Sequence, residues 1–110
     1  MDLIAVYTTV ATRDDARAIA RALVERRLAA CVQIEVIESL YAWQGELADE
    51  TEYRILAKTT AARYAEVESA IRSLHPYELP AIHAVALARV HEPYARWVAE
   101  GSSGDRAGDR

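Results

Sequence analysis

Three histidines are the side chains of this sequence best suited to metal or proton chemistry. His75, His83 and His91 are eight residues apart, a spacing that matches no metal-binding motif on a single helix or strand. His75 differs from the other two because it begins the segment His-Pro-Tyr-Glu-Leu-Pro (75–80) at the predicted end of a helix. An imidazole there either caps helix carbonyls as a cation or binds a divalent transition metal, and the sequence leaves both interpretations open.

The other reactive groups are one cysteine and a group of acids. Cys31 and a histidine would form a nucleophilic pair on paper, but the surrounding segment 28–32 is apolar, so we predict that the thiol is buried and inert. Asp49, Glu50 and Glu52 lie near a predicted turn. They form either an acidic site for a divalent ion or a solvated charged surface.

Standard catalytic signatures are absent from the sequence. It contains no phosphate-binding loop, no Gly-x-Gly-x-x-Gly, no Gly-x-Ser-x-Gly, no Cys-x-x-Cys and no His-Glu-x-x-His. Three of the four glycines lie at 101, 104 and 108, which excludes a glycine-rich phosphate cradle. We therefore predict that the protein is not an enzyme. An acid–base enzyme that uses His75 and Glu52 is the last of three hypotheses, after a metal-responsive binding protein and an oligomeric scaffold.

Composition and charge favour one domain in a reducing, cytoplasmic setting. The chain has 110 residues, 52% of them hydrophobic, and a net charge of −4, which fits a single domain. No cluster of Lys and Arg indicates nucleic-acid binding, and no stretch approaches the roughly 18 consecutive apolar residues of a membrane span. The N-terminus runs into a predicted strand without the basic start of a signal peptide, and a single cysteine forms no internal disulfide.

Hydrophobic periodicity predicts an α+β domain over residues 1–100, followed by a flexible tail over 101–110. The predicted elements are a strand over 3–10, a helix from a Thr12 cap to Arg27, a strand over 31–43, a turn at 44–46, a strand over 52–59, a helix over 60–74, a strand over 81–90 and a short helix over 93–100. This order is the ferredoxin-like β-α-β-β-α-β sandwich, with one antiparallel sheet and both long helices on one face.

The hairpin over 31–59 is too long for so small a sheet. It carries Tyr41 and Trp43 close to its turn, and a two-stranded ribbon is marginal by itself. Aromatic residues are enriched at interfaces, and unpaired strand edges need a partner or protection. We therefore predict that the hairpin contacts a neighbouring subunit, and that threefold closure of such contacts removes the free edges.

Five segments of the chain resemble the CutA divalent-ion tolerance family, in the same order and over Val6 to Glu100. They are Leu28-Ala29-Ala30-Cys31-Val32, Leu40-Tyr41-Ala42-Trp43-Gln44-Gly45, Ile55-Leu56-Ala57-Lys58-Thr59, His75-Pro76-Tyr77-Glu78-Leu79-Pro80 and Tyr94-Ala95-Arg96-Trp97. The resemblance implies a ferredoxin-like fold, a homotrimer and a structural similarity to the nitrogen-regulatory PII proteins. It also implies a role in tolerance to copper and other divalent ions. The alternative is a PII-like scaffold or signalling protein that binds a small ligand or a protein partner.

The resemblance also implies candidate site residues. Some members of the family carry a cysteine where this sequence has Thr8 and a histidine where it has Leu74, and both are metal ligands there. Of that set this sequence keeps His75 alone, which implies weak copper binding at this residue. The residues that match family positions around the cleft between subunits are Trp43, Glu52, Lys58, His75, Tyr77 and Trp97. Their mixture of one base, one acid, one imidazole and several aromatic rings suits an ion or a small anion.

Overall fold

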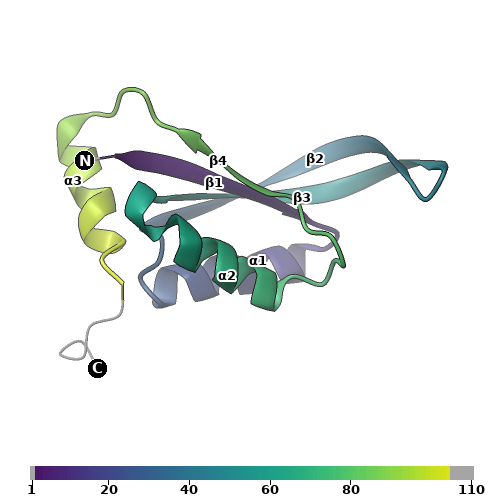
Figure 1. Ribbon diagram of the computed structural model, residues 1–110, viewed down its shortest axis with the longest axis horizontal. Helices are drawn as coiled ribbons and strands as arrows, with labels where there is room; N and C mark the ends of the chain where they lie inside the picture. The colour runs from purple at the N-terminus through teal and green to yellow at the C-terminus, as the bar shows by residue number, and fades with distance from the viewer. Residues whose placement is uncertain (1, 105–110) are drawn as a thin grey trace.

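The computed structural model of the protein describes residues 2–104 and contains one four-stranded sheet with helices packed against it (Figure 1). Its strands occur in the order β2-β3-β1-β4, and each neighbouring pair is antiparallel. This is the arrangement of the ferredoxin-like fold, so the predicted fold class is confirmed. The elements are β1 (Leu3–Val10), α1 (Arg13–Glu25), β2 (Cys31–Trp43), β3 (Glu46–Thr60), a 3-10 turn (Ala61–Arg63), α2 (Tyr64–Leu74), β4 (Ile82–Ala86) and α3 (Glu92–Gly101).

The main core lies between the sheet and two of the helices. Helices α1 and α2 cover the same face of the sheet, and α3 lies at the end where β1 begins (Figure 1). Burying one large aliphatic side chain contributes about 1.5–3 kcal/mol, so these apolar faces are what holds the two layers together. The large side chains of this core that are at most 1% exposed are Val6, Val10, Ile19, Leu23, Ile55, Val67 and Ile71.

No helix within residues 2–104 is long and apolar enough to cross a membrane.

Local sequence explains where α1 begins, whereas contacts with a distant segment hold the end of α1. Thr12 accepts a hydrogen bond at its Oγ1 from the backbone N–H of Asp15 at 3.1 Å, which confirms it as the N-cap. At the other end Arg27 has φ +58°, the left-handed conformation in which glycine usually ends a helix. The guanidinium of Arg27 donates to the carbonyl oxygen of Glu100 and to Oγ of Ser103, both at 2.7 Å. The end of α1 is therefore joined to the end of α3.

A two-residue turn determines the register of the hairpin. Gln44 and Gly45 have φ +51° and +82°, and positive φ at both central residues is what a type I′ turn requires. Trp43 then lies opposite Glu46, and all 13 residues of β2 pair with β3. Because the turn is this tight, β3 begins at Glu46, six residues earlier than the predicted start at 52.

The distal part of the hairpin projects beyond the sheet. β1 pairs with β3 only as far as Tyr53, so the remainder of β2 and β3 forms a two-stranded ribbon (Figure 1). Within residues 2–104 this ribbon has strands on neither side and no helix packed against it. Large apolar side chains are exposed there by 37–72%, and they are Leu40, Tyr41, Trp43 and Leu47.

Two further predictions differ from the structure. β4 ends at Ala86 rather than at 90 because β1, its neighbour, begins at Leu3. The N–H of Leu87 donates to the carbonyl of Leu3 at 3.0 Å, and the residues that follow have no strand to pair with. Cys31 is half-buried rather than buried, because it lies opposite Lys58 on the sheet face that α1 and α2 leave open.

The C-terminal segment is ordered beyond the predicted boundary at residue 100. α3 extends to Gly101, Ser102 and Gly104 are buried, and the N–H of Gly104 donates to the carbonyl of Arg27 at 2.8 Å. A Cβ on Gly101 would lie 2.7 Å from Cβ of Ala30, so α3 approaches the start of β2 closely. The prediction of a flexible tail over 101–110 does not hold for 101–104, and 105–110 lie outside the described residues.

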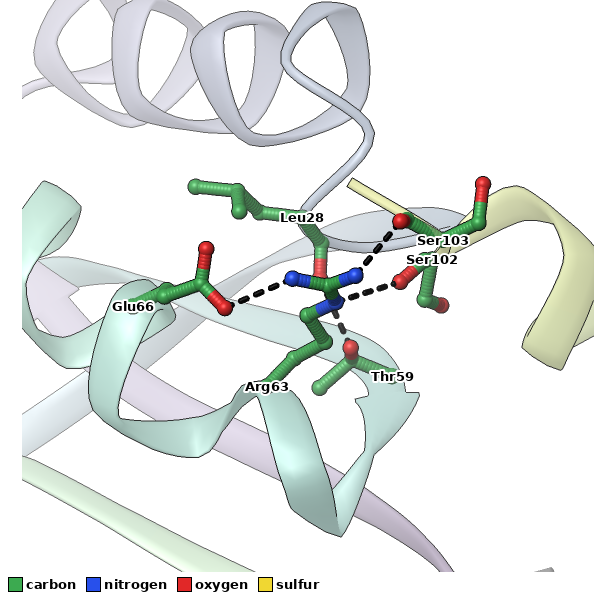
Figure 2. Close-up of polar contacts among 6 residues, drawn as sticks. All are labelled: Leu28, Thr59, Arg63, Glu66, Ser102 and Ser103. Carbon is green, nitrogen blue, oxygen red and sulfur yellow. Dashed lines mark hydrogen bonds and ion pairs between the residues drawn. The ribbon is translucent and has the colours of Figure 1, made fainter. Parts of the chain in front are cut away.

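Arg63 fastens this segment to the start of α2 (Figure 2). Its Nε donates to the carbonyl of Ser102 at 3.0 Å and its Nη2 to the carbonyl of Ser103 at 2.5 Å. Its Nη1 pairs with the carboxylate of Glu66 at 2.6 Å. A planar guanidinium offers five donors in a fixed geometry, so one side chain satisfies two carbonyls that follow a helix end. We refer to Arg63, Ser102 and Ser103, with Arg27, as the C-terminal clasp.

The clasp yields a stability prediction. Arg63→Met keeps most of the aliphatic stem and removes every donor, so two partly buried carbonyls lose their partners. We expect a destabilisation of about 2–3 kcal/mol and a melting temperature lower by several degrees in a calorimetric scan. Arg72→Met, an exposed arginine in the last turn of α2, is the matched control and should melt close to the wild type. Equal melting of all three proteins would contradict this role for Arg63.

Candidate functional site

A cavity of about 790 Å³ lies where the hairpin leaves the sheet. Its walls come from the end of β1, from the distal halves of β2 and β3, and from the segment 77–81 that follows α2. A volume in this range accommodates a small molecule. The acidic and aromatic residues of the lining are Glu38, Glu50, Glu52, Glu78, Tyr41, Trp43 and Tyr77.

A proline positions the aromatic residue that contacts the buried acid of this cavity. α2 ends at Leu74, and His75 is extended with ψ 131°, as the residue before Pro76 must be. Tyr77 follows, and its hydroxyl donates to Oε2 of Glu52 at 2.7 Å, whose side chain belongs to a residue only 5% exposed. Burial, and then the bond to Glu52, raises the pKa of Tyr77, so the phenol stays a hydrogen-bond donor near neutral pH.

His75 uses both of its ring nitrogens inside the protein. Nε2 lies 2.8 Å from the carbonyl oxygen of Thr9, and Nδ1 accepts the backbone N–H of Tyr77 at 3.1 Å. A ring that donates at Nε2 and accepts at Nδ1 is a neutral imidazole. Burial lowers the pKa of His75, against the opposing effect of the Thr9 carbonyl, and so favours this neutral form. In this state His75 positions Tyr77 and does not line the cavity.

The residues of a single chain do not fit a transition-metal site. Thr8 is buried and its hydroxyl has no hydrogen-bond partner, and Leu74 offers no donor atom. Both nitrogens of His75 are occupied, so a metal would have to displace one of its hydrogen bonds. Within residues 2–104 no three side chains of His, Cys, Asp or Glu are grouped so that they could hold a metal ion.

The predicted cleft residues form two separate groups within the single chain. Trp43, Glu52 and Tyr77 belong to the cavity. Lys58 and Trp97 belong to the second group. Nζ of Lys58 lies 5.4 Å from the ring centroid of Tyr94, and Tyr94 stacks on Trp97 with ring centroids 5.7 Å apart. Six strand residues, or about 20 Å, separate Glu52 from Lys58 along β3. A single chain therefore does not bring the predicted acid and base together.

Sequence analysis did not identify a second phenol–carboxylate pair in the cavity. The hydroxyl of Tyr41 donates to Oε1 of Glu50 at 2.5 Å, and this hydrogen bond is the main reason that the pKa of Tyr41 is raised to about 12. The sequence does contain a signal for this pair, namely the strand register that a two-residue turn implies. Such a turn places Trp43 opposite Glu46 and therefore Tyr41 opposite Ala48. Glu50 is then the diagonal neighbour of Tyr41 on the same face, within reach of a long side chain.

Known proteins share this fold over nearly the whole chain. The family model of the CutA1 divalent ion tolerance protein matches residues 4–101. The divalent-cation tolerance protein CutA of Thermus thermophilus is 42% identical over 96 residues, which are 86% of this chain and 93% of that protein. The protein of the same name from Thermococcus kodakarensis is 33% identical over 99 residues, 90% of this chain and 95% of that protein. The structure of CutA from Synechococcus elongatus matches with a TM-score of 0.89 and 38% identity, covering 92% of this chain and 90% of that one.

The matched region contains the structural elements that form the site. Residues 4–101 include the hairpin, both long helices and the whole lining of the cavity. Identities of 33–42% over so much of the chain confirm the family that the five sequence segments indicated. The chain belongs to the CutA1 divalent ion tolerance protein family.

Proposed function

We propose that the protein serves divalent-cation tolerance as a homotrimeric binding protein, with the hairpin cavity as its binding site. Membership of the family supports the tolerance role. The observation that carries the rest is the projecting ribbon, which exposes large apolar side chains around a cavity of about 790 Å³. Binding, rather than catalysis, fits a cavity in which the phenols of Tyr41 and Tyr77 already donate to carboxylates.

Unpaired strand edges support the proposed assembly. β2 and β4 are the two edges of the sheet, and edges with free backbone groups need a partner or protection. The ribbon adds exposed apolar side chains such as Leu40 and Leu47, of the kind that subunit contacts bury. If the hairpin of each subunit contacts the next subunit in a closed ring, no edge remains free, and three subunits form such a ring.

Trimerisation also accounts for the two separated groups of cleft residues. Glu52 and Lys58 are about 20 Å apart along one strand. One cleft contains an acid and a base together only if neighbouring subunits supply one each. In the proposed trimer, Trp43, Glu52 and Tyr77 of one subunit therefore form a cleft with Lys58 and Trp97 of another.

Divalent copper is a weak ligand in this proposal. His75 offers a nitrogen only after one of its two hydrogen bonds breaks, and that loss reduces the affinity. Copper binds imidazole more tightly than nickel or zinc does, so it is the metal best able to displace such a bond. The remaining donors would be water, a carboxylate such as Glu52, or side chains of a neighbouring subunit.

The second candidate is a PII-like trimeric scaffold that binds a small ligand or a protein partner without metal. The engaged ring of His75 and the lack of a metal-binding group within residues 2–104 favour it. Native mass spectrometry with copper, with zinc and without metal separates the two candidates. A stoichiometric copper adduct on the trimer supports metal binding, and an unchanged trimer without adducts supports the scaffold.

The assembly is tested first. We expect light scattering at micromolar concentration to give three times the 12.2 kDa mass of the chain, because closure satisfies the edges of every subunit. A monomer mass would contradict the trimer, and a dimer mass would contradict the threefold closure.

Trp43 tests the contact that holds the trimer together. Trp43→Ala removes a side chain that is 45% exposed in one subunit and that the proposed contact buries. Truncating a fully buried tryptophan costs about 3–5 kcal/mol. We therefore expect a lower melting temperature, and dissociation of the variant at protein concentrations at which the wild type is still assembled. Val24→Ala, a similarly exposed residue on α1, should leave the mass unchanged. A Trp43→Ala protein with wild-type mass and melting would show that Trp43 is outside the contact.

His75 tests the copper proposal. We expect calorimetric titration to detect weak copper binding to the wild type at neutral pH and less to His75→Ala, with His91→Gln as the matched control. Proton and metal compete for the same nitrogen, so binding should decline as the pH falls through the pKa of His75. Burial lowers that pKa, which places the decline below the usual imidazole range. Equal affinity of wild type and His75→Ala would remove His75 from the site.

A further inference from the structure

Glu52 is the only charged residue within residues 2–104 that is buried, and no cation of that part of the chain pairs with it. The residue is 5% exposed and accepts one hydrogen bond there, at Oε2 from the hydroxyl of Tyr77. A phenol donates a proton but carries no positive charge, so it does not neutralise the carboxylate. Because buried carboxylates are normally paired with a cation, the partner of Glu52 must come from outside the chain.

Lys58 is the matching unpaired cation. The Lys and Arg side chains that are half-buried within residues 2–104 are those of Arg27, Arg54, Lys58 and Arg63. Each of the three arginines donates to a carboxylate or carbonyl oxygen. Lys58 forms no ion pair within that range, and its Nζ lies 5.4 Å from the ring centroid of Tyr94. The ring attracts the charge but leaves the three N–H donors of the ammonium group without an oxygen acceptor.

The two unpaired charges cannot meet within one chain. Glu52 and Lys58 are about 20 Å apart along β3, whereas an ion pair needs about 4 Å. The strand cannot fold back between them, because β3 pairs with β2 over this whole stretch. Alternate residues of a strand share a face, and Ile55 and Ala57 lie in the core. Both charges therefore lie on the side of the sheet opposite to α1 and α2.

A second copy of the chain supplies both partners at once. In a closed ring of identical subunits, each subunit presents one surface to the subunit on one side and a different surface to the subunit on the other. If Glu52 belongs to the first surface and Lys58 to the second, every contact joins one acid to one base, and neither charge remains unpaired. A cation from solution would satisfy Glu52 alone and leave Lys58 as it is.

We propose that Glu52 of each subunit forms a buried ion pair with Lys58 of the neighbouring subunit, and that this pair selects the neighbour in the assembly. The inference rests on the proposed trimer and deepens it, because it names the contact that each subunit completes for the next. Oε1 of Glu52 accepts from the ammonium group, while Tyr77 continues to donate to Oε2. Tyr94 holds the ammonium group in position from its own subunit.

Such a pair has a characteristic energetic signature. The cost of removing two charges from water offsets much of their attraction, so replacing both partners by uncharged groups changes the stability little. Removing one partner leaves the other charge buried and uncompensated, which is strongly destabilising. A second substitution that removes the remaining charge should therefore restore the assembly that the first one weakened. Independent sites cannot behave in this way, because their effects add.

The first test measures, by light scattering over a dilution series of the full chain, the concentration at which half of the assembly has dissociated. Lys58→Met keeps the aliphatic stem beside Tyr94 and removes the charge, and it should raise this concentration by about tenfold or more. Glu52→Gln keeps an oxygen acceptor for Tyr77. Added to Lys58→Met, it should return the concentration toward the wild-type value.

Arg54 provides the matched control. It lies on the same face of β3 as Glu52, but its Nε pairs with Glu35 of its own chain at 3.1 Å. Glu52→Gln added to Arg54→Met should therefore restore nothing.

A carbodiimide cross-link tests the pair in the wild type, without any substitution. Lys58 is the only lysine of the chain, so besides the N-terminus it provides the only amine. A carbodiimide joins an amine directly to a carboxylate that it contacts, as an amide without a spacer. We expect mass spectrometry to find Lys58 joined to Glu52, in species of two and three chain masses. Since the two residues are about 20 Å apart in one chain, this link can only join two chains.

Two results would overturn the ion pair and leave the trimer standing. One is a trimer in which Lys58 is joined to another carboxylate or to none. The other is a Lys58→Met protein whose assembly Glu52→Gln leaves unchanged or weakens further. A monomer mass for the wild type is a different outcome, because it would refute the proposed assembly and the ion pair together.

Discussion

The two-residue turn at the tip of the hairpin is the constraint on which the rest of the site depends. Gln44 and Gly45 both have positive φ, and the resulting turn determines which residue of β2 faces which residue of β3. Side chains alternate between the two faces of a strand, so a slip of one residue would move every side chain of one strand to the opposite face. Tyr41 would then lose Glu50. Two backbone conformations at the tip thus determine the chemistry of a cavity whose lining extends from Trp43, beside the turn, to the end of β1.

A chain of hydrogen bonds connects this hairpin to the end of α2. The Thr9 carbonyl holds His75, His75 accepts the backbone N–H of Tyr77, and Tyr77 donates to Glu52. The chain requires a neutral imidazole, because a protonated ring has no acceptor at Nδ1. Burial lowers the pKa of His75 and supplies that condition. A histidine that the sequence presents as a possible ligand is therefore better explained as the group that positions an aromatic ring over a buried acid.

The fold could be predicted from the sequence because it depends on local patterns, whereas parts of the site depend on contacts between distant residues and could not. The Thr12 cap, the His-Pro end of α2 and the alternation in β2 each act within a few residues, so the elements and the fold class could be predicted. The clasp joins Arg63 to carbonyls about 40 residues away, and no sequence pattern near Arg63 or near those carbonyls predicts the contact. The engagement of both nitrogens of His75 likewise depends on a backbone carbonyl of β1, which carries no sequence signal.

In the proposed function, assembly and binding share residues, and that overlap would link their free energies. Trp43 and Tyr41 are exposed on the projecting ribbon and also line the cavity. A ligand in the cavity therefore changes the surface that a neighbouring subunit meets, and a neighbouring subunit changes the cavity. A ligand that binds the assembled form more tightly stabilises the assembly by the difference in its binding free energies, and the assembly raises the affinity for the ligand by the same amount. In the proposed trimer, the projecting ribbon is thus both the contact surface and the element through which a ligand in the cavity would affect the whole assembly.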